Sequence, residues 1–417
     1  MGEEARRVII DGSMARGGGG FTYLVNVAHR LAAHSPRDRF RLYLRSQLLA
    51  DSIAPAPNLE IVKLPETGLA GRLRFTYVDA PRLAARWGAN LYYSAGEYAP
   101  VSAPCPTVAA FRNPNIFCAD AEDWPLRQRV RLRALRALAK ASAIACDRIL
   151  FVSEDSARWI GERVGLPEHK RAVVHHGIDL ERWRPEPGAS RHARPYVLSV
   201  SSVYRYKNYV RLIEAWAALA ARRPATPDLV IIGDDQDPDY SQRMQRARAA
   251  CGALSARIHL LGEVPYAEVR RWYAGAELFV FPSYLETFGH PLLEAMACEL
   301  PVVAADIPVF REIARDAAFF ADPHRPEALS RAMEEALYAP GARDTLVKRS
   351  RARVKELTWD HTVRGLLDLF ESVAAPRALA RPVRRRPAQA LGWTWPGGER
   401  PLAHHFGARS QRHSASR

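Results

Sequence analysis

Residues 281–297 read FPSYLETFGHPLLEAMA, and this stretch indicates an α/β fold with a ligand site at the end of a strand. A buried strand is expected to end near Phe281. A turn follows it, and then a helix that begins near Gly289 or the next residue, with proline in its first turn. The amides of Thr287, Phe288 and Gly289 would then point out of the amino end of a helix, where an anion such as a diphosphate is favoured.

Two carboxylates accompany this turn, Glu286 before the helix and Glu294 about one and a half turns inside it. Like charges repel, so neither is suited to binding a phosphate directly. Both suit the hydroxyls of a sugar, and we expect Glu286 to face the transferred sugar and Glu294 to face a ribose. The alternative is an ordinary pair of solvated glutamates.

The rest of the chain supports an α/β fold with two domains. Short β-branched runs alternate with longer helical patterns over residues 7–340, which is typical of parallel sheets with crossover helices. Pro, Gly and Ser interrupt the pattern near the middle of the chain, so we predict Rossmann-like domains at residues 1–187 and 188–357 that face each other across a cleft. An amphipathic helix over 358–374 should cross back onto the N-terminal domain, and residues 375–417 should form a basic, disordered tail.

The motifs resemble those of a known family. The resemblance is carried by the Glu286-x7-Glu294 pair with the residues around it, by HGID at 176–179 and by PVVAA at 301–305. The chain resembles the family-4, or group 1, retaining glycosyltransferases. The resemblance covers most of residues 8–340. It implies the GT-B fold, a C-terminal domain that binds a nucleoside-diphosphate sugar and an N-terminal domain that binds the acceptor. It also implies transfer without a protein nucleophile, because the leaving phosphate takes the acceptor proton.

Two cations match the family's phosphate-binding loop. Arg205 and Lys207 follow a predicted strand and would neutralise the diphosphate as its bond to the sugar breaks, in place of a metal ion. The common family pattern has arginine five residues before the lysine, where this chain has Ser202. We therefore expect catalytic roles for Glu286, Arg205 and Lys207, no metal site and no cofactor other than the donor as co-substrate. The acidic run at 234–237 is interpreted as a polar loop.

Two further segments carry candidate contacts in the N-terminal domain. Glycines let the backbone approach a ligand closely, and the resemblance places Gly18 and Gly19 in a loop that reaches the donor across the cleft. A flexible surface loop is the alternative. Many relatives have a histidine after the strand at 107–111, where this chain has Arg112 and Asn113. Either could contact the donor or the acceptor.

The net charge of +15 is unevenly distributed. Residues 376–417 hold nine arginines and one acidic residue, so more than half of the excess lies in the tail, and we expect no nucleic-acid partner. A second basic segment precedes residue 141. At helical spacing, one face of it carries Arg129, Arg133, Arg136 and Lys140, which suits an anionic membrane surface. An ordinary solvated helix face explains it equally well.

Five scattered cysteines and no long apolar run favour a cytoplasmic protein, peripheral on the inner face of the membrane. The expected activity is metal-independent, retaining hexosyl transfer to a glycan or lipid-linked acceptor, with a role in cell-surface polysaccharide biosynthesis. Two alternatives stay open: a GT-B binding protein that has lost catalysis, and a GT-B enzyme that acts on another sugar phosphate.

Overall fold

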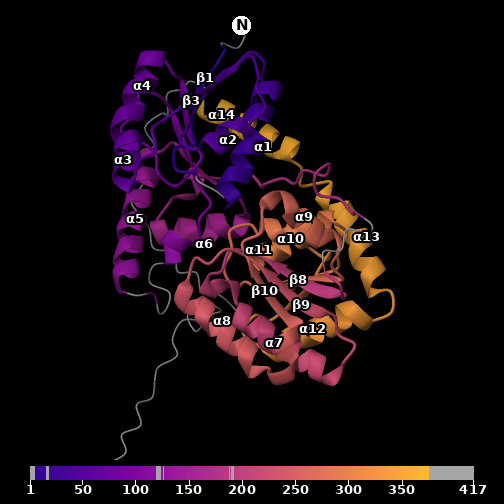
Figure 1. Cartoon of the computed structure of the whole chain (residues 1–417). Helices are drawn as coiled ribbons and strands as arrows, with labels where there is room; N and C mark the ends of the chain where they lie inside the picture. The colour runs from indigo at the N-terminus through magenta and orange to yellow at the C-terminus, as the bar shows by residue number, and fades with distance from the viewer. Residues whose placement is uncertain are drawn as a thin grey trace, which may run out of the picture.

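The computed structural model describes residues 5–15, 18–118, 124, 126–186, 188 and 192–374. They form two α/β domains, one above the other in Figure 1, each built on a single parallel sheet. This architecture confirms the predicted pair of Rossmann-like domains. The tail predicted from residue 375 lies outside the described residues. No helix in the described part of the chain has both the length and the apolar character needed to cross a bilayer.

The N-terminal sheet has the strand order β3-β2-β1-β4-β5-β6-β7. Its strands are β1 (Arg7–Asp11), β2 (Arg39–Leu44), β3 (Leu59–Lys63), β4 (Leu91–Ser94), β5 (Thr107–Phe111), β6 (Arg148–Phe151) and β7 (Arg171–Val173). The helices of this domain are α1 (Gly18–His34), α2 (Gln47–Asp51), α3 (Leu69–Arg74), the π-helical turn η1 (Phe75–Asp79), α4 (Ala80–Trp87), η2 (Asn115–Cys118), α5 (Leu126–Ala145), α6 (Glu154–Val164) and η3 (Glu168–Lys170).

The C-terminal sheet has the order β10-β9-β8-β11-β12-β13. Its strands are β8 (Tyr196–Val200), β9 (Asp228–Ile232), β10 (Ile258–Gly262), β11 (Leu278–Phe281), β12 (Val302–Ala305) and β13 (Phe319–Ala321). The remaining helices are η4 (Arg205–Lys207), α7 (Tyr209–Arg222), α8 (Pro238–Ala250), η5 (Gly252–Arg257), α9 (Tyr266–Ala274), α10 (His290–Ala297), α11 (Pro308–Ala314), α12 (Pro326–Tyr338), α13 (Ala342–Val354) and α14 (Trp359–Ala374).

Both sheets reverse their strand order at one place, between β1 and β4 in the first and between β8 and β11 in the second. Consecutive crossovers leave such a point toward opposite faces of the sheet, so a crevice opens beyond the carboxyl ends of the two strands. In the C-terminal domain, the loops at this crevice are those that carry Lys207 and Glu286. The topology therefore brings these two residues together from positions 79 residues apart.

Two edge strands, β3 and β13, have weak strand patterns in the sequence. β3 has the sequence LEIVK and is only partly buried along its length, so its apolar content is lower than that of the central strands. β13 has three residues, which is too short for a strand pattern to register. The central strands β4, β5, β9 and β11 are buried at every position and read as continuous apolar runs, as parallel strands do.

Helix α14 follows the second domain in sequence but packs on the first (Figure 1). Its side chains Trp359, Val363, Leu366 and Phe370 share one apolar cluster with Leu24, Val27 and Leu31 of α1 and Tyr93 of β4. The ring centroids of Tyr93 and Phe370 are 5.2 Å apart. The second domain is thus tied to the first at both of its ends.

The chain crosses between the domains at residues 174–180 and again at 355–358, and the two crossings touch. Ile178 donates its backbone amide to the carbonyl of Leu357 at 2.8 Å. A Cβ added at Gly177 would lie 2.1 Å from the backbone nitrogen of Trp359. Only glycine fits there, because the neighbouring atoms belong to the backbone and cannot rotate away.

We therefore predict that Gly177→Ala lowers the free energy of unfolding by at least about 2 kcal/mol, since the start of α14 must shift. Gly68→Ala is the matched control, because nothing lies within 4 Å of an added Cβ at that position, and it should change stability by no more than about 0.5 kcal/mol. Urea denaturation of both variants measures the difference. Equal stabilities would show that the two crossings are not tightly packed.

Candidate active site

Lys207 and Glu286 form an ion pair at the switch point of the C-terminal sheet. The Lys207 Nζ lies 2.5 Å from Glu286 Oε1, and each side chain is about 10% exposed. Lys207 ends the short helix η4, and Glu286 lies in the turn before α10. A buried cation and a buried carboxylate with a short separation form a polarised pair that a charged ligand can enter and rearrange.

Both domains hold the turn between β11 and α10. Ser153 at the amino end of α6 donates its hydroxyl to the carbonyl of Thr287 at 2.7 Å, and the Thr287 hydroxyl donates to the carbonyl of Arg112 at 2.6 Å. Gly289 then precedes α10 with φ of 93°, where an added Cβ would lie 2.7 Å from the Phe310 ring. Thr287, Phe288 and Gly289 are buried and lie at the junction of the domains.

Glu294 is buried within α10 and accepts a hydrogen bond from the hydroxyl of Tyr273 at 3.0 Å. Burial raises the pKa of its carboxyl from 4.5 to about 7, and the Tyr273 hydrogen bond and the charge of Arg182 only partly oppose this. The Arg182 guanidinium lies 4.2 Å from the centre of the Tyr266 ring. Tyr266 in turn accepts a 3.4 Å hydrogen bond from Thr22 of α1, across the domain junction.

Arg205 lies in the same short helix as Lys207 but has a different partner. Its guanidinium binds both oxygens of Asp237, at 2.9 and 3.2 Å, and lies 4.4 Å from the centre of the Trp124 ring. Asp237 also caps α8 by accepting from the amide of Tyr240. Of the two predicted cations, Lys207 therefore contacts Glu286 and Arg205 is held by another carboxylate.

Arg112 lies in the N-terminal half of the junction. Its guanidinium contacts the Ala95 carbonyl and lies 4.2 Å from the centre of the Tyr23 ring, while its Nε is buried without a hydrogen-bond partner. The backbone amides of Arg112 and Asn113 both donate to Glu97 Oε1. Asn113 is exposed and lines a cavity of about 420 Å³ shared with Trp124, Arg205 and Asp237.

The glycine loop is only partly described. Gly18 and Gly19 begin α1, are exposed, and have nothing within 4 Å of an added Cβ. The same helix carries Thr22, which reaches Tyr266. The first turn of α1 therefore faces the C-terminal domain on the side of Glu294.

A pair of histidines, His176 of the interdomain turn and His290 at the start of α10, lies at the junction of the domains. His176 Nδ1 and His290 Nε2 are 2.8 Å apart, and their rings are stacked. Burial lowers the pKa of His290 to about 4 and that of His176 well below its ordinary value, with neighbouring positive charge adding to both. Both imidazoles are thus neutral near pH 7, and one must donate to the other. Tyr273 and Arg182 lie outside the motifs identified in the sequence. His176 and His290 belong to the motifs at 176–179 and 281–297, but neither motif indicates that the two rings pair.

Within the described residues, one cluster of three side chains could offer ligands to a metal ion. His192, Asp228 and His259 bring potential ligand atoms within 4.8 Å of one another. Asp228 begins β9 and so lies at the amino edge of the sheet, away from Glu286. It already accepts from Arg257 at 3.0 Å and is 3.3 Å from Arg194, so positive charge is already present where a metal ion would sit.

The four cationic residues predicted to face a membrane lie on one side of α5 and differ in exposure. Arg133 and Lys140 of α5 are exposed, but Arg129 and Arg136 are only half-exposed. The residues that α5 buries are Leu132, Ala139, Ser142 and Ala143. Three apolar residues of α5 are exposed, with Val130 57%, Leu126 68% and Ile144 65% exposed. Exposed apolar and cationic side chains therefore share the solvent side of α5.

Comparison with known proteins matches both domains to one family. The model described as Glycosyltransferase Family 4 matches residues 17–182, and the model described as Glycosyl transferases group 1 matches residues 182–353. The chain belongs to the group 1, or family 4, glycosyltransferases. Together the two matches cover the N-terminal domain and the C-terminal domain up to α13.

The names of two relatives of this glycosyltransferase refer to different activities. A D-inositol 3-phosphate glycosyltransferase of Salinispora tropica is 28% identical over 70% of this chain, and the match spans 61% of that relative's length. An O-antigen chain mannosyltransferase B of Escherichia coli is 29% identical over 42% of this chain and 45% of its own. Among solved structures, Anabaena HepE in complex with UDP-glucose superposes with a TM-score of 0.69 at 16% identity, over 88% of this chain and 99% of its own. This last likeness shows the shared GT-B fold.

The raised pKa of Glu294 predicts a pH-dependent stability. The folded chain keeps a proton on Glu294 up to about pH 7, whereas the unfolded chain loses it near 4.5. Stability from this group is therefore lost as pH rises through that window, on the order of 3 kcal/mol in total. Relative to the parent chain, Glu294→Gln should gain unfolding free energy between pH 4.5 and 8 by this order. The exposed Glu335→Gln should show no such trend, and a pH-independent difference for Glu294→Gln would contradict the assignment.

Proposed function

We propose that this glycosyltransferase transfers a sugar, with retention of configuration and without a metal ion, from a nucleoside-diphosphate sugar to a glycan or lipid-linked acceptor. The observation that carries the proposal is the Lys207–Glu286 pair, 2.5 Å apart and nearly buried at the amino end of α10. Lys207 and the helix end supply positive charge for the leaving diphosphate. Glu286 accepts hydrogen bonds from the transferred sugar, and Glu294 accepts them from the ribose.

The reaction needs no protein nucleophile in this arrangement. The bond between the anomeric carbon and the phosphate oxygen breaks, and the acceptor hydroxyl bonds to the same face of that carbon. Its proton passes to the leaving phosphate oxygen. Lys207 then exchanges its partner Glu286 for the diphosphate. The negative charge that forms on the leaving diphosphate is therefore stabilised by a cation that is already in place.

The cavity next to Asn113 is the proposed acceptor side. Its lining combines the Trp124 ring with side chains that hydrogen-bond to hydroxyls, namely Asn113, Asn115, Gln128, Gln236 and Asp239. Aromatic faces and planar polar groups together are typical of carbohydrate sites. The name of the Escherichia coli relative, an O-antigen chain mannosyltransferase, agrees with a glycan acceptor, and we infer a role in cell-surface polysaccharide assembly.

Binding and transfer test this proposal together. Uridine, guanosine and adenosine diphosphates are screened by thermal shift, and one of them should raise the melting temperature, because a ligand bound only to the folded state stabilises it. Lys207→Met and Glu286→Gln should each lower sugar transfer by roughly 10²- to 10³-fold. Arg205→Met should lower it less, since Asp237 already holds that side chain.

Glu335→Gln on α12 is the matched control for loss of one carboxylate, and its transfer rate should equal that of the parent. Binding without transfer in the parent chain, across all sugars of the bound nucleotide, would indicate a protein that has lost catalysis. Anomeric proton couplings in the product check retention. A product of inverted configuration would overturn the proposed chemistry.

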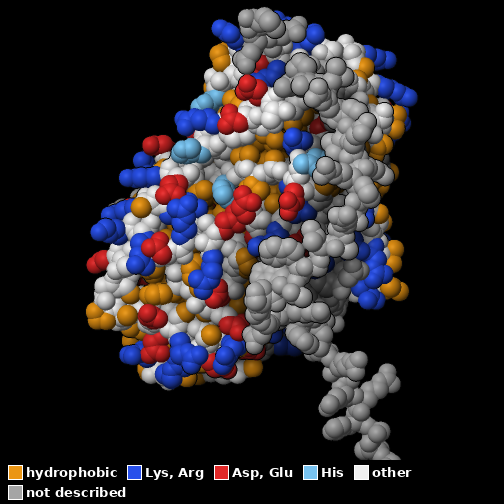
Figure 2. Space-filling view, turned by 180° about the vertical axis from the view of Figure 1, so that it is seen from behind, with side chains coloured by type: hydrophobic (Ala, Val, Ile, Leu, Met, Phe, Trp, Pro, Cys, Tyr) orange, Lys and Arg blue, Asp and Glu red, His pale blue; other side chains and the backbone are white. Residues whose placement is uncertain are grey.

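Membrane attachment through α5 belongs to the same proposal. Leu126, Val130 and Ile144 lie along one helix face beside Arg133 and Lys140, and α5 lines one edge of the N-terminal domain in Figure 1. Apolar side chains that enter the lipid surface and cations that meet its phosphates together favour an anionic bilayer. In the opposite view of Figure 2, cationic and acidic side chains are interspersed over the left and lower parts of the face, whereas cationic side chains lie beside hydrophobic ones along the right edge.

Leu126→Gln/Val130→Gln/Ile144→Gln should release the protein from vesicles of phosphatidylglycerol and phosphatidylcholine in a sedimentation assay. Leu48→Gln/Leu261→Gln removes two other exposed leucines and should leave sedimentation unchanged. Arg133→Gln/Lys140→Gln should weaken binding and reduce its dependence on salt. Full sedimentation of the triple variant would exclude α5 as the attachment site.

A further inference from the structure

A second polar cavity lies beside the transfer site, on the outer side of the loop that carries Lys207. Its volume is about 340 Å³, within the range of small-molecule sites. Residues from four loops and helices of the C-terminal domain line it: Arg205, Asn208, Val210, Arg211, Glu214, Tyr240, Arg243, Tyr284 and His324. Asn208 follows Lys207 in the chain and Tyr284 precedes Glu286 by two residues, so the cavity adjoins the proposed reaction centre.

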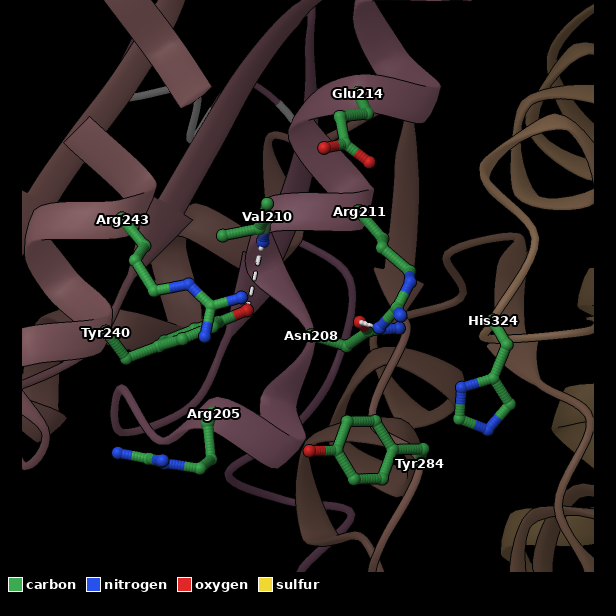
Figure 3. A pocket seen from close by; sticks show the side chains of 9 residues that line it. All are labelled: Arg205, Asn208, Val210, Arg211, Glu214, Tyr240, Arg243, Tyr284 and His324. Atoms are coloured by element: carbon green, nitrogen blue, oxygen red, sulfur yellow. Dashed lines mark hydrogen bonds between the residues drawn. The ribbon is translucent and has the colours of Figure 1, made fainter. Parts of the chain in front are cut away.

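Figure 3 shows where the cationic side chains of this cavity point. Arg243 extends from α8 toward the hydroxyl of Tyr240, and Arg211 extends from α7 between Asn208 and His324. Arg205 points away from Arg211, consistent with its ion pair to Asp237. Arg205, Arg211 and Arg243 all line the cavity together with His324, but Arg205 is already paired with Asp237, so an anionic ligand would meet Arg211 and Arg243. Glu214 is the one carboxylate of the lining.

Asn208 holds this cavity in one shape. It has φ of 65°, and its side-chain amide donates to the carbonyls of Pro282 and Pro323 at 3.1 and 2.6 Å. Its Oδ1 accepts from Arg211 Nη1 at 3.0 Å. The cavity is therefore built before a ligand arrives, because one buried residue joins three loops and orients Arg211.

The chemistry of the lining selects a phosphate group. Arginine offers several donors in a plane that fits phosphate oxygens, and two arginines can bind one phosphate from opposite sides. The amide of Val210 at the start of α7 already donates to the Tyr240 hydroxyl at 3.1 Å, so the arginines carry this preference and the helix end does not. The cavity is also larger than a bare phosphate needs, which leaves room for the sugar that bears it.

We propose that this cavity binds a phosphate group carried by the acceptor, and so orients the acceptor hydroxyl toward the Lys207–Glu286 pair. The role in orienting the acceptor rests on the proposed sugar transfer. The binding of phosphate in the cavity does not depend on it. Nothing in the donor site needs Arg211 or Arg243. The two sites can therefore be occupied together and tested separately.

The test is a calorimetric titration of the full chain with inorganic phosphate and with glucose 6-phosphate, in protein already saturated with its nucleoside diphosphate and at constant ionic strength set by chloride. Both should bind saturably, and glucose 6-phosphate should bind more tightly. Arg211→Gln/Arg243→Gln should weaken both at least tenfold while leaving nucleotide affinity within twofold of the parent. Glu214→Gln should tighten the binding of both ligands severalfold, because it removes a negative charge that repels phosphate. This variant provides the test if the double arginine variant does not fold.

Arg246→Gln/Arg271→Gln is the matched control. It removes two exposed arginines that do not line the cavity and should bind phosphate as the parent does. The proposal is overturned if phosphate gives no saturable heat, if the double variant binds unchanged, or if glucose 6-phosphate binds no more tightly than inorganic phosphate. If no nucleoside diphosphate binds at all, the donor assignment fails alone, and the same titration without nucleotide still decides the cavity.

Discussion

The turn between β11 and α10 is held by hydrogen bonds from both domains, and the rest of the site depends on it. Ser153 binds the carbonyl of Thr287, and the Thr287 hydroxyl binds the carbonyl of Arg112. These two contacts fix the position of Glu286, which precedes Thr287 in the chain. A change in the distance between the domains must therefore move the carboxylate that we assign to the transferred sugar.

Local sequence was sufficient for the fold and for the centre of the site. The stretch at 281–297 predicted a strand, a turn and a helix in that order, and the structure has them. Of its two glutamates, one lies in the turn and the other on α10, as predicted. The Lys207–Glu286 contact follows from topology, because the loops after β8 and β11 meet wherever the strand order reverses. Residues whose position follows from one helix or one sheet edge could thus be predicted.

What the sequence could not predict depends on packing between distant segments. Arg205 had the residue type and the loop position of a phosphate ligand, yet Asp237, 32 residues away, binds it. The pairing of His176 with His290 joins an interdomain turn to a helix 114 residues later. On α5, helical spacing gave the relative positions of the cations but not which side faces the domain, and the structure shows that Leu132, Ala139, Ser142 and Ala143 form the buried side. Each of these contacts depends on a residue distant in the sequence, which a local pattern does not indicate.

The central claim is that Lys207 leaves Glu286 to meet the diphosphate of the donor at the amino end of α10. A crystal structure with a bound nucleoside diphosphate tests it most directly, through the position of Lys207 Nζ. The account predicts the terminal phosphate beside the backbone of residues 287–289, with Nζ within hydrogen-bond distance of its oxygens and Glu294 at the ribose. A nucleotide bound elsewhere, with Lys207 still 2.5 Å from Glu286, would contradict it.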